Sequence, residues 1–243
     1  MSLLSDLRVL WHLLLSPIRG TSHAERLNSF YAGQAADYDA FRARLLKGRG
    51  ELLQSLPAPT GGVWVDMGGG TGANLEAAPW LSSCRRVVVA DLCQPLLDVC
   101  RERVQHRGWS QVEPVLADVT TYDPGEPVDL VTFSYSLTMI PDWFRAVERA
   151  RAMLAPGGVI GIVDFYVSRK YVPANRVRHG WLTRSLIPVW FATDNVHPSR
   201  DHLPYLESRF ETVRLDEDRA AIPYVPLLKA PYYRFVGRKP LHD

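Results

Sequence analysis

Apolar residues fall into short runs that are separated by stretches with helical spacing. The runs are rich in valine, leucine and aromatic residues, which is typical of buried strands. They lie at 63–65, 86–90, 112–116, 128–134, 159–164, 210–215 and 232–237. Residues 143–154 have the three- and four-residue spacing of a helix. Strands that alternate with helices predict an α/β fold.

A glycine-dense turn follows the first run. Asp66 ends the expected strand, and Gly68, Gly70 and Gly72 precede a helix that opens at Ala73. Glycine lets the backbone turn sharply and approach a ligand, because it has no Cβ. The start of a helix adds free N–H groups and a positive dipole end. This combination suits a nucleoside ligand with a cationic or hydroxyl-rich end.

Two families share parts of this turn. Gly68, Gly70 and Ala73 fit the G-x-G-x-x-A pattern of dinucleotide-binding proteins, which is weak evidence alone. With Asp66 in front, the turn resembles the glycine loop of class I S-adenosylmethionine-dependent methyltransferases, and so does the Leu-x-Pro-Gly-Gly turn at 154–158. This second resemblance implies a Rossmann-like, seven-stranded, mostly parallel sheet with a reversed C-terminal hairpin. It also implies S-adenosylmethionine as cofactor and S-adenosylhomocysteine as product.

The methyltransferase resemblance also assigns roles to residues at the strand ends. Asp66 would lie near the methionine amino group, Asp91 would bind the ribose hydroxyls, and Asp118 would lie beside the adenine amino group. The expected cofactor-binding residues are Tyr31, Tyr38, Arg42, Asp66, Gly68, Gly70, Thr71, Gly72, Asn74, Asp91, Leu92, Asp118, Val119, Ser134 and Met139.

Helices are expected before the first strand. The amphipathic stretch 1–20 either packs on protein or lies in a lipid headgroup layer, with Trp11 at the boundary. Residues 30–42 form either an ordinary amphipathic helix or a lid over the cofactor. In the lid, Tyr38 would face the sulfonium and Arg42 would pair with the cofactor carboxylate. The rest of the chain, 21–243, is expected to be one methyltransferase domain.

Composition sets further bounds. A chain of 243 residues is long enough for one α/β domain with a sizeable core. A net charge of +2 without a run of Lys or Arg predicts no nucleic-acid partner. The three cysteines lack metal or redox spacing, and the histidines have no metal spacing either, so no metal is expected. No apolar run is long enough to span a bilayer. These features predict a cytoplasmic protein, and the amphipathic stretch 1–20 adds the expectation of peripheral membrane association.

Candidate acceptor residues follow the fourth and fifth strands. Tyr135 and Ser136 lie where a parallel strand ends beside the ligand, and they could accept N–H bonds from an amine acceptor. Either Tyr135 or Asp164 is expected to relay the proton that the amine loses. The insertion at 165–205 interleaves cationic and aromatic residues, and is expected either to cap the acceptor pocket or simply to cover the sheet. The expected substrate-binding residues are Arg178, His179, Arg184, Trp190 and Tyr232.

A more specific resemblance covers most of the chain. It is carried by six segments, 30–49, 64–76, 133–143, 154–167, 190–207 and 231–240. They resemble the methyltransferase part of betaine lipid synthases. The resemblance implies threefold methylation of the amino group of diacylglyceryl-homoserine, giving diacylglyceryl-trimethylhomoserine. The acceptor would then be a lipid at a membrane surface, and a separate aminocarboxypropyl transferase would make that lipid.

Three other functions stay open at this stage. The chain could methylate a soluble amine or a quinone, or it could transfer an aminocarboxypropyl group from the same cofactor. It could also be a non-catalytic binding module, although the set formed by Asp66, the glycines and Asp91 argues against that.

Overall fold

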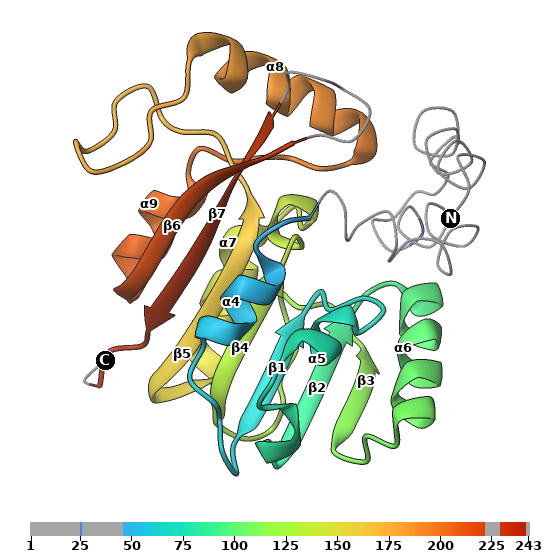
Figure 1. Ribbon diagram of the computed structural model, residues 1–243. Coiled ribbons are helices and arrows are strands. Elements are labelled where there is room, and N and C mark those ends of the chain that lie inside the picture. Colours follow the sequence, from blue (N-terminus) through green and yellow to red (C-terminus); the bar gives the residue numbers. More distant parts are fainter. Residues whose placement is uncertain (1–24, 26–45, 222–228, 242–243) are drawn as a thin grey trace.

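The fold is built on one mixed sheet. The computed structural model describes Glu25, residues 46–221 and residues 229–241. Within these residues, seven strands form a sheet in the order β3-β2-β1-β4-β5-β7-β6. Strands β1 to β5 pair in parallel, whereas β7 runs antiparallel between β5 and β6 (Figure 1). The expected α/β fold, a mostly parallel seven-stranded sheet with a reversed C-terminal hairpin, is confirmed.

The strands follow the apolar runs closely. They span Val63–Met67 (β1), Arg86–Asp91 (β2), Val112–Leu116 (β3), Val128–Ser134 (β4), Leu154–Phe165 (β5), Glu211–Ala221 (β6) and Lys229–Arg238 (β7). β5 begins before the expected residue 159, because Leu154 already pairs with Val128 and the register then shifts. The last two strands are also longer than their apolar runs, because their paired ends continue into polar residues.

Helices connect the strands. They span Arg49–Ser55 (α4), Ala73–Ala77 (α5), Gln94–Arg107 (α6), Trp143–Met153 (α7), Trp181–Phe191 (α8) and His202–Arg209 (α9). Short 3₁₀ turns lie at Leu81–Ser83 (η1), Leu137–Met139 (η2) and Ala192–Asp194 (η3). The expected helix at 1–20 and the expected lid at 30–42 lie outside the described residues. None of the helices in the described ranges is long and apolar enough to cross a bilayer.

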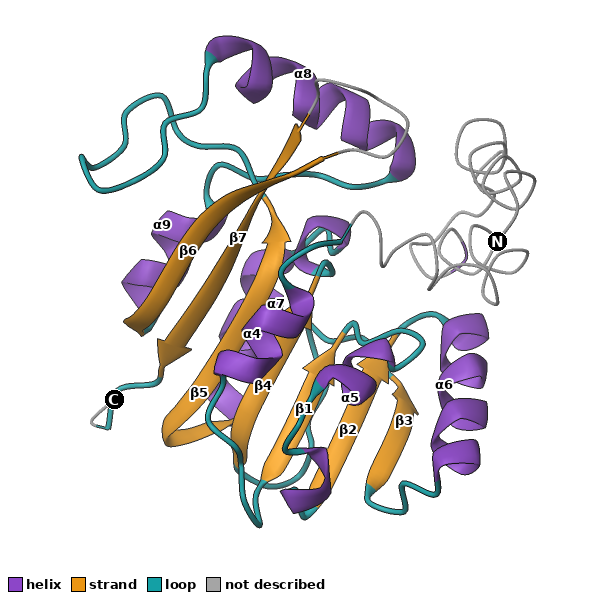
Figure 2. Cartoon of the chain, viewed as in Figure 1, coloured by secondary structure: helices purple, strands orange, loops and turns teal. Residues whose placement is uncertain are grey.

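Each face of the sheet has its own apolar core. Alternate strand residues point to opposite faces, so Trp64 packs with α4, α5 and α6, whereas its neighbour Val65 packs with α7 and α9. Helix α8 lies at neither face but beyond the carboxyl end of β5, where Ile187 and Phe191 join the first core (Figure 2). The two cores hold the strands in place, and α8 extends the molecule at the end where the parallel strands finish.

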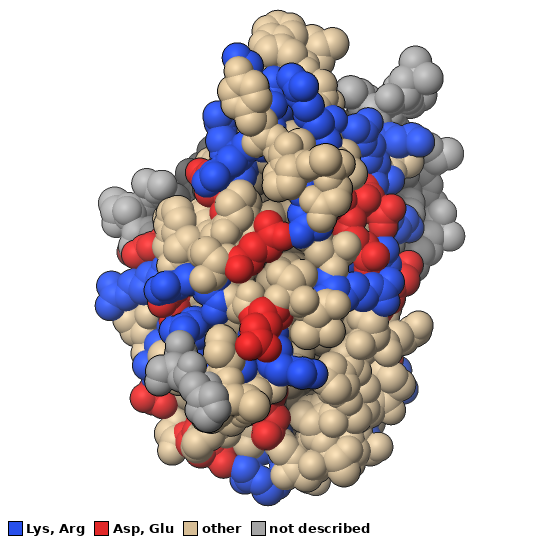
Figure 3. Space-filling model, turned by 90° about the vertical axis from the view of Figure 1, so that its left-hand side faces the viewer, with Lys and Arg blue, Asp and Glu red and all other residues tan. Residues whose placement is uncertain are grey.

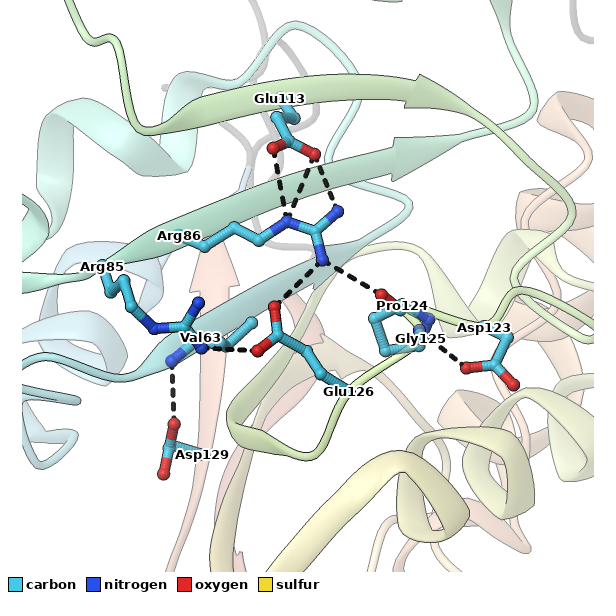
Figure 4. A network of polar contacts seen from close by, with 9 residues as sticks. All are labelled: Val63, Arg85, Arg86, Glu113, Asp123, Pro124, Gly125, Glu126 and Asp129. Atoms are coloured by element: carbon cyan, nitrogen blue, oxygen red, sulfur yellow. Dashed lines mark hydrogen bonds and ion pairs between the residues drawn. The ribbon is translucent and has the colours of Figure 1, made fainter.

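Ionic contacts tie the amino ends of the strands together. Arg86 at the start of β2 donates to Glu113 on β3 at 2.8 Å and to Glu126 at 3.2 Å, and Asp129 accepts from the backbone N–H of Val63 at 2.8 Å (Figure 4). These charges are partly exposed, so each pair adds little stability. The network helps align the strands at the edge opposite the one where β1, β2 and β4 end.

A buried histidine lies under the hairpin. His202, at the start of α9, is fully buried, and its ring lies 4.6 Å from that of Trp143 and 6.1 Å from that of Tyr233. Neither ring nitrogen has a hydrogen-bond partner among the described residues. Burial lowers the pKa of His202 to about 3, so the ring stays neutral in the folded protein.

This burial predicts a specific dependence of stability on pH. The unfolded histidine binds a proton below about pH 6.5, whereas the folded one does not until about pH 3. The unfolded state therefore gains protons first as the pH falls, and the histidine lowers the free energy of unfolding from pH 6.5 downward. When the pH falls from 7 to 5, we expect the free energy of unfolding to decrease by about 2 kcal/mol less in His202→Leu than in wild type.

Urea unfolding at a series of pH values measures this difference. Asp66 and Asp164, whose pKa values are raised, act in the opposite direction, but they are present in both proteins and cancel in the comparison. His106→Leu on the exposed surface of α6 is the matched control. Parallel pH curves for wild type and His202→Leu would show that the buried ring does not govern acid stability.

Candidate functional site

The glycine turn after β1 packs tightly against the segment after β4. Gly68, Gly70 and Gly72 have φ values of 69°, 56° and 70°, a left-handed conformation that suits glycine. A Cβ on Gly68 would lie 2.5 Å from Cβ of Ser136. β1 and β4 are neighbours in the sheet, yet their connections leave in opposite directions, so a crevice forms between their ends.

Asp66 holds the turn from inside the protein. Its carboxylate is fully buried and accepts from Asn74 Nδ2 at 2.8 Å and from Thr132 Oγ1 at 2.6 Å. Thr132 in turn accepts from the indole N–H of Trp64 at 2.8 Å. Burial raises the pKa of Asp66 to about 6, although the hydrogen bonds from Thr132 and Asn74 oppose this shift. Asp66 therefore contacts the sheet and the following helix rather than the cavity.

Asp91 holds the same turn from the other side. It ends β2, and its Oδ2 accepts from the backbone N–H of Gly70 at 2.8 Å. Its Oδ1 accepts from the N–H of Cys93, also at 2.8 Å. Unlike Asp66, this carboxylate lines the cavity beside the turn.

That cavity has a volume of about 270 Å³. Eight expected cofactor or catalytic residues line it: Gly68, Gly70, Asp91, Leu92, Asp118, Val119, Tyr135 and Met139. Ser136, which was expected to contact the acceptor amine, also lines it. Seven more lining residues were not among the expected site residues: Cys93, Leu96, Ala117, Thr120, Ile140, Pro141 and Asp142. Most of these adjoin an expected residue in sequence, which was the signal available for them. Leu96 is different, because only the position of α6 against the turn brings it to the cavity.

The other expected cofactor residues lie elsewhere. Thr71, Gly72 and Asn74 do not line the cavity, and neither does Ser134, which accepts from Arg49 Nε at 3.1 Å. Tyr31, Tyr38 and Arg42 lie outside the described residues.

The cavity has acidic groups at its edge and apolar walls. Asp118 is exposed, and its Oδ1 accepts from the N–H of Thr120 at 2.8 Å and from its hydroxyl at 2.7 Å. Val119 and Leu92 lie beside the two carboxylates. Such a mixture suits a ligand with a flat apolar base and hydroxyl or amino groups.

Tyr135 lines the cavity in an unusual conformation. It has a positive φ of 55° and is almost fully buried. Its hydroxyl donates to the backbone carbonyl of Lys47 at 2.5 Å, and its ring packs on Phe165 at 4.7 Å. Burial raises the pKa of the phenol far above its usual value. The phenol therefore stays neutral and keeps its proton, and a neutral phenol is too weak a base to favour the expected role as proton acceptor.

Asp164 lies behind the cavity wall. It is fully buried and does not line the cavity. It accepts from Thr138 Oγ1 at 2.7 Å and from the N–H of Phe165 at 2.8 Å. Burial raises the pKa of Asp164 to about 6, against the hydrogen bond from Thr138. The carboxylate therefore supports the turn η2, which carries Met139 into the cavity, and its position does not favour direct proton transfer.

The expected substrate-binding residues do not converge on the cavity. His179 Nδ1 accepts from the N–H of Ser168 at 3.0 Å, and burial, with Arg219 and Arg184 nearby, lowers the pKa of His179 to about 4. A neutral, buried ring does not favour ionic binding of a carboxylate. Arg178 is exposed, Arg184 and Trp190 are half-buried, and Tyr232 is buried within β7.

Aromatic rings connect the cavity with α8. Phe165 packs on Tyr135 at 4.7 Å and on Phe191 at 5.0 Å, and Trp190 follows next to Phe191 at 5.7 Å. A row of packed aromatic rings, which we call the aromatic path, thus connects the cavity wall with the helix that lies at this end of the molecule. No group of His, Cys, Asp and Glu in the described ranges could hold a metal ion.

Parts of this chain are similar in sequence to known proteins. Residues 65–158 match the family described as "Methyltransferase domain". A trans-aconitate 2-methyltransferase of Variovorax paradoxus is 33% identical over 113 residues, which cover 46% of this chain and 42% of that protein. The ubiquinone/menaquinone biosynthesis C-methyltransferase UbiE of Hydrogenovibrio crunogenus is 33% identical over 109 residues, covering 43% and 42%.

A solved structure with the same fold is the N-methyltransferase NodS of Bradyrhizobium japonicum in complex with S-adenosyl-L-homocysteine. It has a TM-score of 0.65 at 17% identity, over 88% of this chain and 98% of that one. The chain spans less than half the length of the two curated relatives named above. The matched segment contains the glycine turn, Asp91 and Asp118, and the whole sheet has the class I arrangement. Residues 65–158 therefore match a methyltransferase domain, and the described sheet has a class I, Rossmann-like fold.

Proposed function

We propose that the chain methylates the amino group of a lipid acceptor, diacylglyceryl-homoserine, and forms the betaine lipid diacylglyceryl-trimethylhomoserine. The observation that supports this most directly is the cavity between the glycine turn and Tyr135, from which aromatic side chains lead to α8. The lipid itself comes from the sequence resemblance to betaine lipid synthases. Its precursor would come from a separate aminocarboxypropyl transferase.

The residues at the cavity fit S-adenosylmethionine. Two backbone N–H groups hold the carboxylate of Asp91 in the cavity wall. In this position the carboxylate can accept hydrogen bonds from the ribose hydroxyls. Asp118 offers Oδ2 to the adenine amino group, since Oδ1 accepts from Thr120. Gly68 and Gly70 line the cavity and have no side chains, so they leave space for the rest of the nucleoside. When bound, the cofactor supplies an electrophilic methyl group on a sulfonium.

The chain must then orient the amine and exclude water. Ser136 lines the cavity, and its hydroxyl donates to the carbonyl of Met67 at 3.0 Å, so its oxygen can accept an N–H from the acceptor. The ring of Tyr135 lies in the cavity wall next to Ser136. The hydrogen bond from its hydroxyl to the carbonyl of Lys47 fixes the orientation of the ring. Positioning of this kind accounts for much of the rate of a methyl transfer, because the donor is already reactive.

The aromatic path to α8 favours an acceptor with an apolar part. Trp190, half-buried at the outer end of these packed rings, would contact an acyl chain, while the amine would reach Ser136. A lipid acceptor agrees with peripheral membrane association of a protein that works from the cytoplasm. Arg178, just before α8, and Arg184, within α8, are the remaining candidates to bind the homoserine carboxylate.

A second candidate function is methylation of a quinone or a soluble amine. UbiE, by its name a quinone C-methyltransferase, is among the relatives, and the aromatic path would also suit a quinone. Transfer of the aminocarboxypropyl group would use the same cavity with a different carbon of the cofactor. Product analysis distinguishes these reactions.

We expect the protein to move label from methyl-labelled S-adenosylmethionine into a lipid when it is given diacylglyceryl-homoserine in detergent micelles. The labelled product should carry methyl groups on nitrogen, and S-adenosylhomocysteine should appear in step with them. Mass spectrometry of both products is the measurement. A quinone and a soluble amine, homoserine, are the comparison acceptors. Labelling of only the quinone or homoserine, or release of methylthioadenosine, contradicts the proposal.

We expect Asp91→Asn to weaken binding of S-adenosylhomocysteine roughly ten- to a hundredfold, because hydrogen bonds to a carboxylate are stronger than those to an amide. Isothermal titration calorimetry measures the affinity. Asp98→Asn on α6 is the control, since that carboxylate is exposed and pairs with Arg101. If both variants bind like wild type, Asp91 does not hold the nucleoside.

A further inference from the structure

Helix α8 exposes an apolar face to its surroundings. Leu182, Leu186 and Val189 are 60%, 58% and 72% exposed, and their i, i+4, i+7 spacing places them on one side of the helix. Trp181 at the start of the helix is 70% exposed. The opposite side is anchored, because Ile187 and Phe191 are buried in the core. Large apolar side chains gathered on one exposed helix face indicate an interaction surface.

The segment that contains this helix is basic. Residues 169–191 include Arg169, Lys170, Arg176, Arg178 and Arg184 but no Asp or Glu. In the part of the chain that the structure describes, Arg169 pairs with Asp201 and Arg176 with Glu207, whereas the other three form no ion pair. The face in Figure 3 has Lys and Arg around uncharged side chains at its upper end, the end that carries α8, and mixed charges below.

An exposed aromatic residue extends the surface beyond the helix. Tyr171, in the loop before α8, is 79% exposed, and Lys170 Nζ lies 5.2 Å from the centre of its ring. Cationic and aromatic side chains around an apolar helix face are typical of helices that lie in the interface of an anionic membrane. We call residues 169–191 the α8 surface.

We propose that the α8 surface docks on an anionic lipid bilayer, with Trp181, Leu182, Leu186 and Val189 entering the headgroup layer and the basic residues contacting lipid phosphates. An anionic bilayer fits better than a protein partner, because the charges that the described residues leave without an ion pair on this surface, those of Lys170, Arg178 and Arg184, are all positive. The helix lies along the boundary, since it has only 11 residues and cannot span the bilayer.

The position of the α8 surface would place a docked bilayer next to the candidate site. Phe191, on the buried side of the same helix, packs on Phe165, and Phe165 packs on Tyr135 in the cavity wall. A bilayer against the exposed side of α8 would therefore lie at the outer end of the aromatic path. The benefit of this position rests on the lipid acceptor proposed above, whereas docking itself can be measured without turnover.

The experiment is co-sedimentation of the full chain with phosphatidylcholine vesicles that contain or lack phosphatidylglycerol. We expect wild type to bind the anionic vesicles more strongly and to dissociate as salt is added. Leu186→Glu should lower the partition coefficient at least tenfold. Lys170→Gln should lower it about fivefold, the contribution of one basic residue near an anionic surface.

Val213→Glu is the matched control, because Val213 on β6 is 56% exposed and lies outside the α8 surface. Retained binding of S-adenosylhomocysteine, measured by calorimetry, confirms that each variant is folded. Three results would overturn the proposal: no preference of wild type for anionic vesicles, equal binding of Leu186→Glu and wild type, or a dimer of wild type that Leu186→Glu dissociates.

The two proposals fail separately. Methylation of diacylglyceryl-homoserine in detergent micelles without vesicle binding would remove only the docking surface. Vesicle binding that depends on Leu186 and Lys170, without methylation of that lipid, would leave the docking surface in place and remove only the lipid acceptor.

Discussion

Two hydrogen-bonded carboxylates determine the shape of the site. A turn with three left-handed glycines has many conformations available when unfolded, so it needs strong local partners to hold one of them. Asp66 holds the turn from below by accepting a hydrogen bond from Asn74. Asp91 holds it from the side by accepting one from the N–H of Gly70. Burying such charges is costly unless they are hydrogen-bonded, which explains why Asp66 is surrounded by donors. The cavity exists because the turn is fixed at this height above the sheet.

Much of the fold followed from local patterns. Each expected strand is present, and the acidic residues Asp91 and Asp118 reach one cavity because the carboxyl ends of parallel strands meet at one edge of the sheet. Apolar runs and strand-end residues are properties of short segments, so the sequence reveals them directly. The start of β5 was missed because the Pro-Gly-Gly segment at 156–158 indicated a turn, although Leu154 already pairs with Val128 there.

The roles of single side chains could not be predicted in the same way. Tyr135 and Asp164 have the chemistry of proton acceptors, but the structure gives them the carbonyl of Lys47 and the hydroxyl of Thr138 as partners. His179 likewise bonds to Ser168. These partners come from distant segments, or from a turn whose geometry no local pattern encodes. The sequence therefore identifies which residues lie near the site, whereas tertiary contacts decide which of their atoms remain available to a ligand.

The close approach of Gly68 and Ser136 constrains which residues can occupy two positions that are far apart in sequence. A methyl group at 68 would come within 2.5 Å of Cβ at 136, so a lineage that acquires alanine at the first position must lose the side chain at the second. The φ of 69° at position 68 also strains any side chain there, so homologues should keep glycine at 68 and vary only at 136. A designer who wishes to change the residue at 136 to alter the acceptor thus inherits a constraint from the cofactor turn.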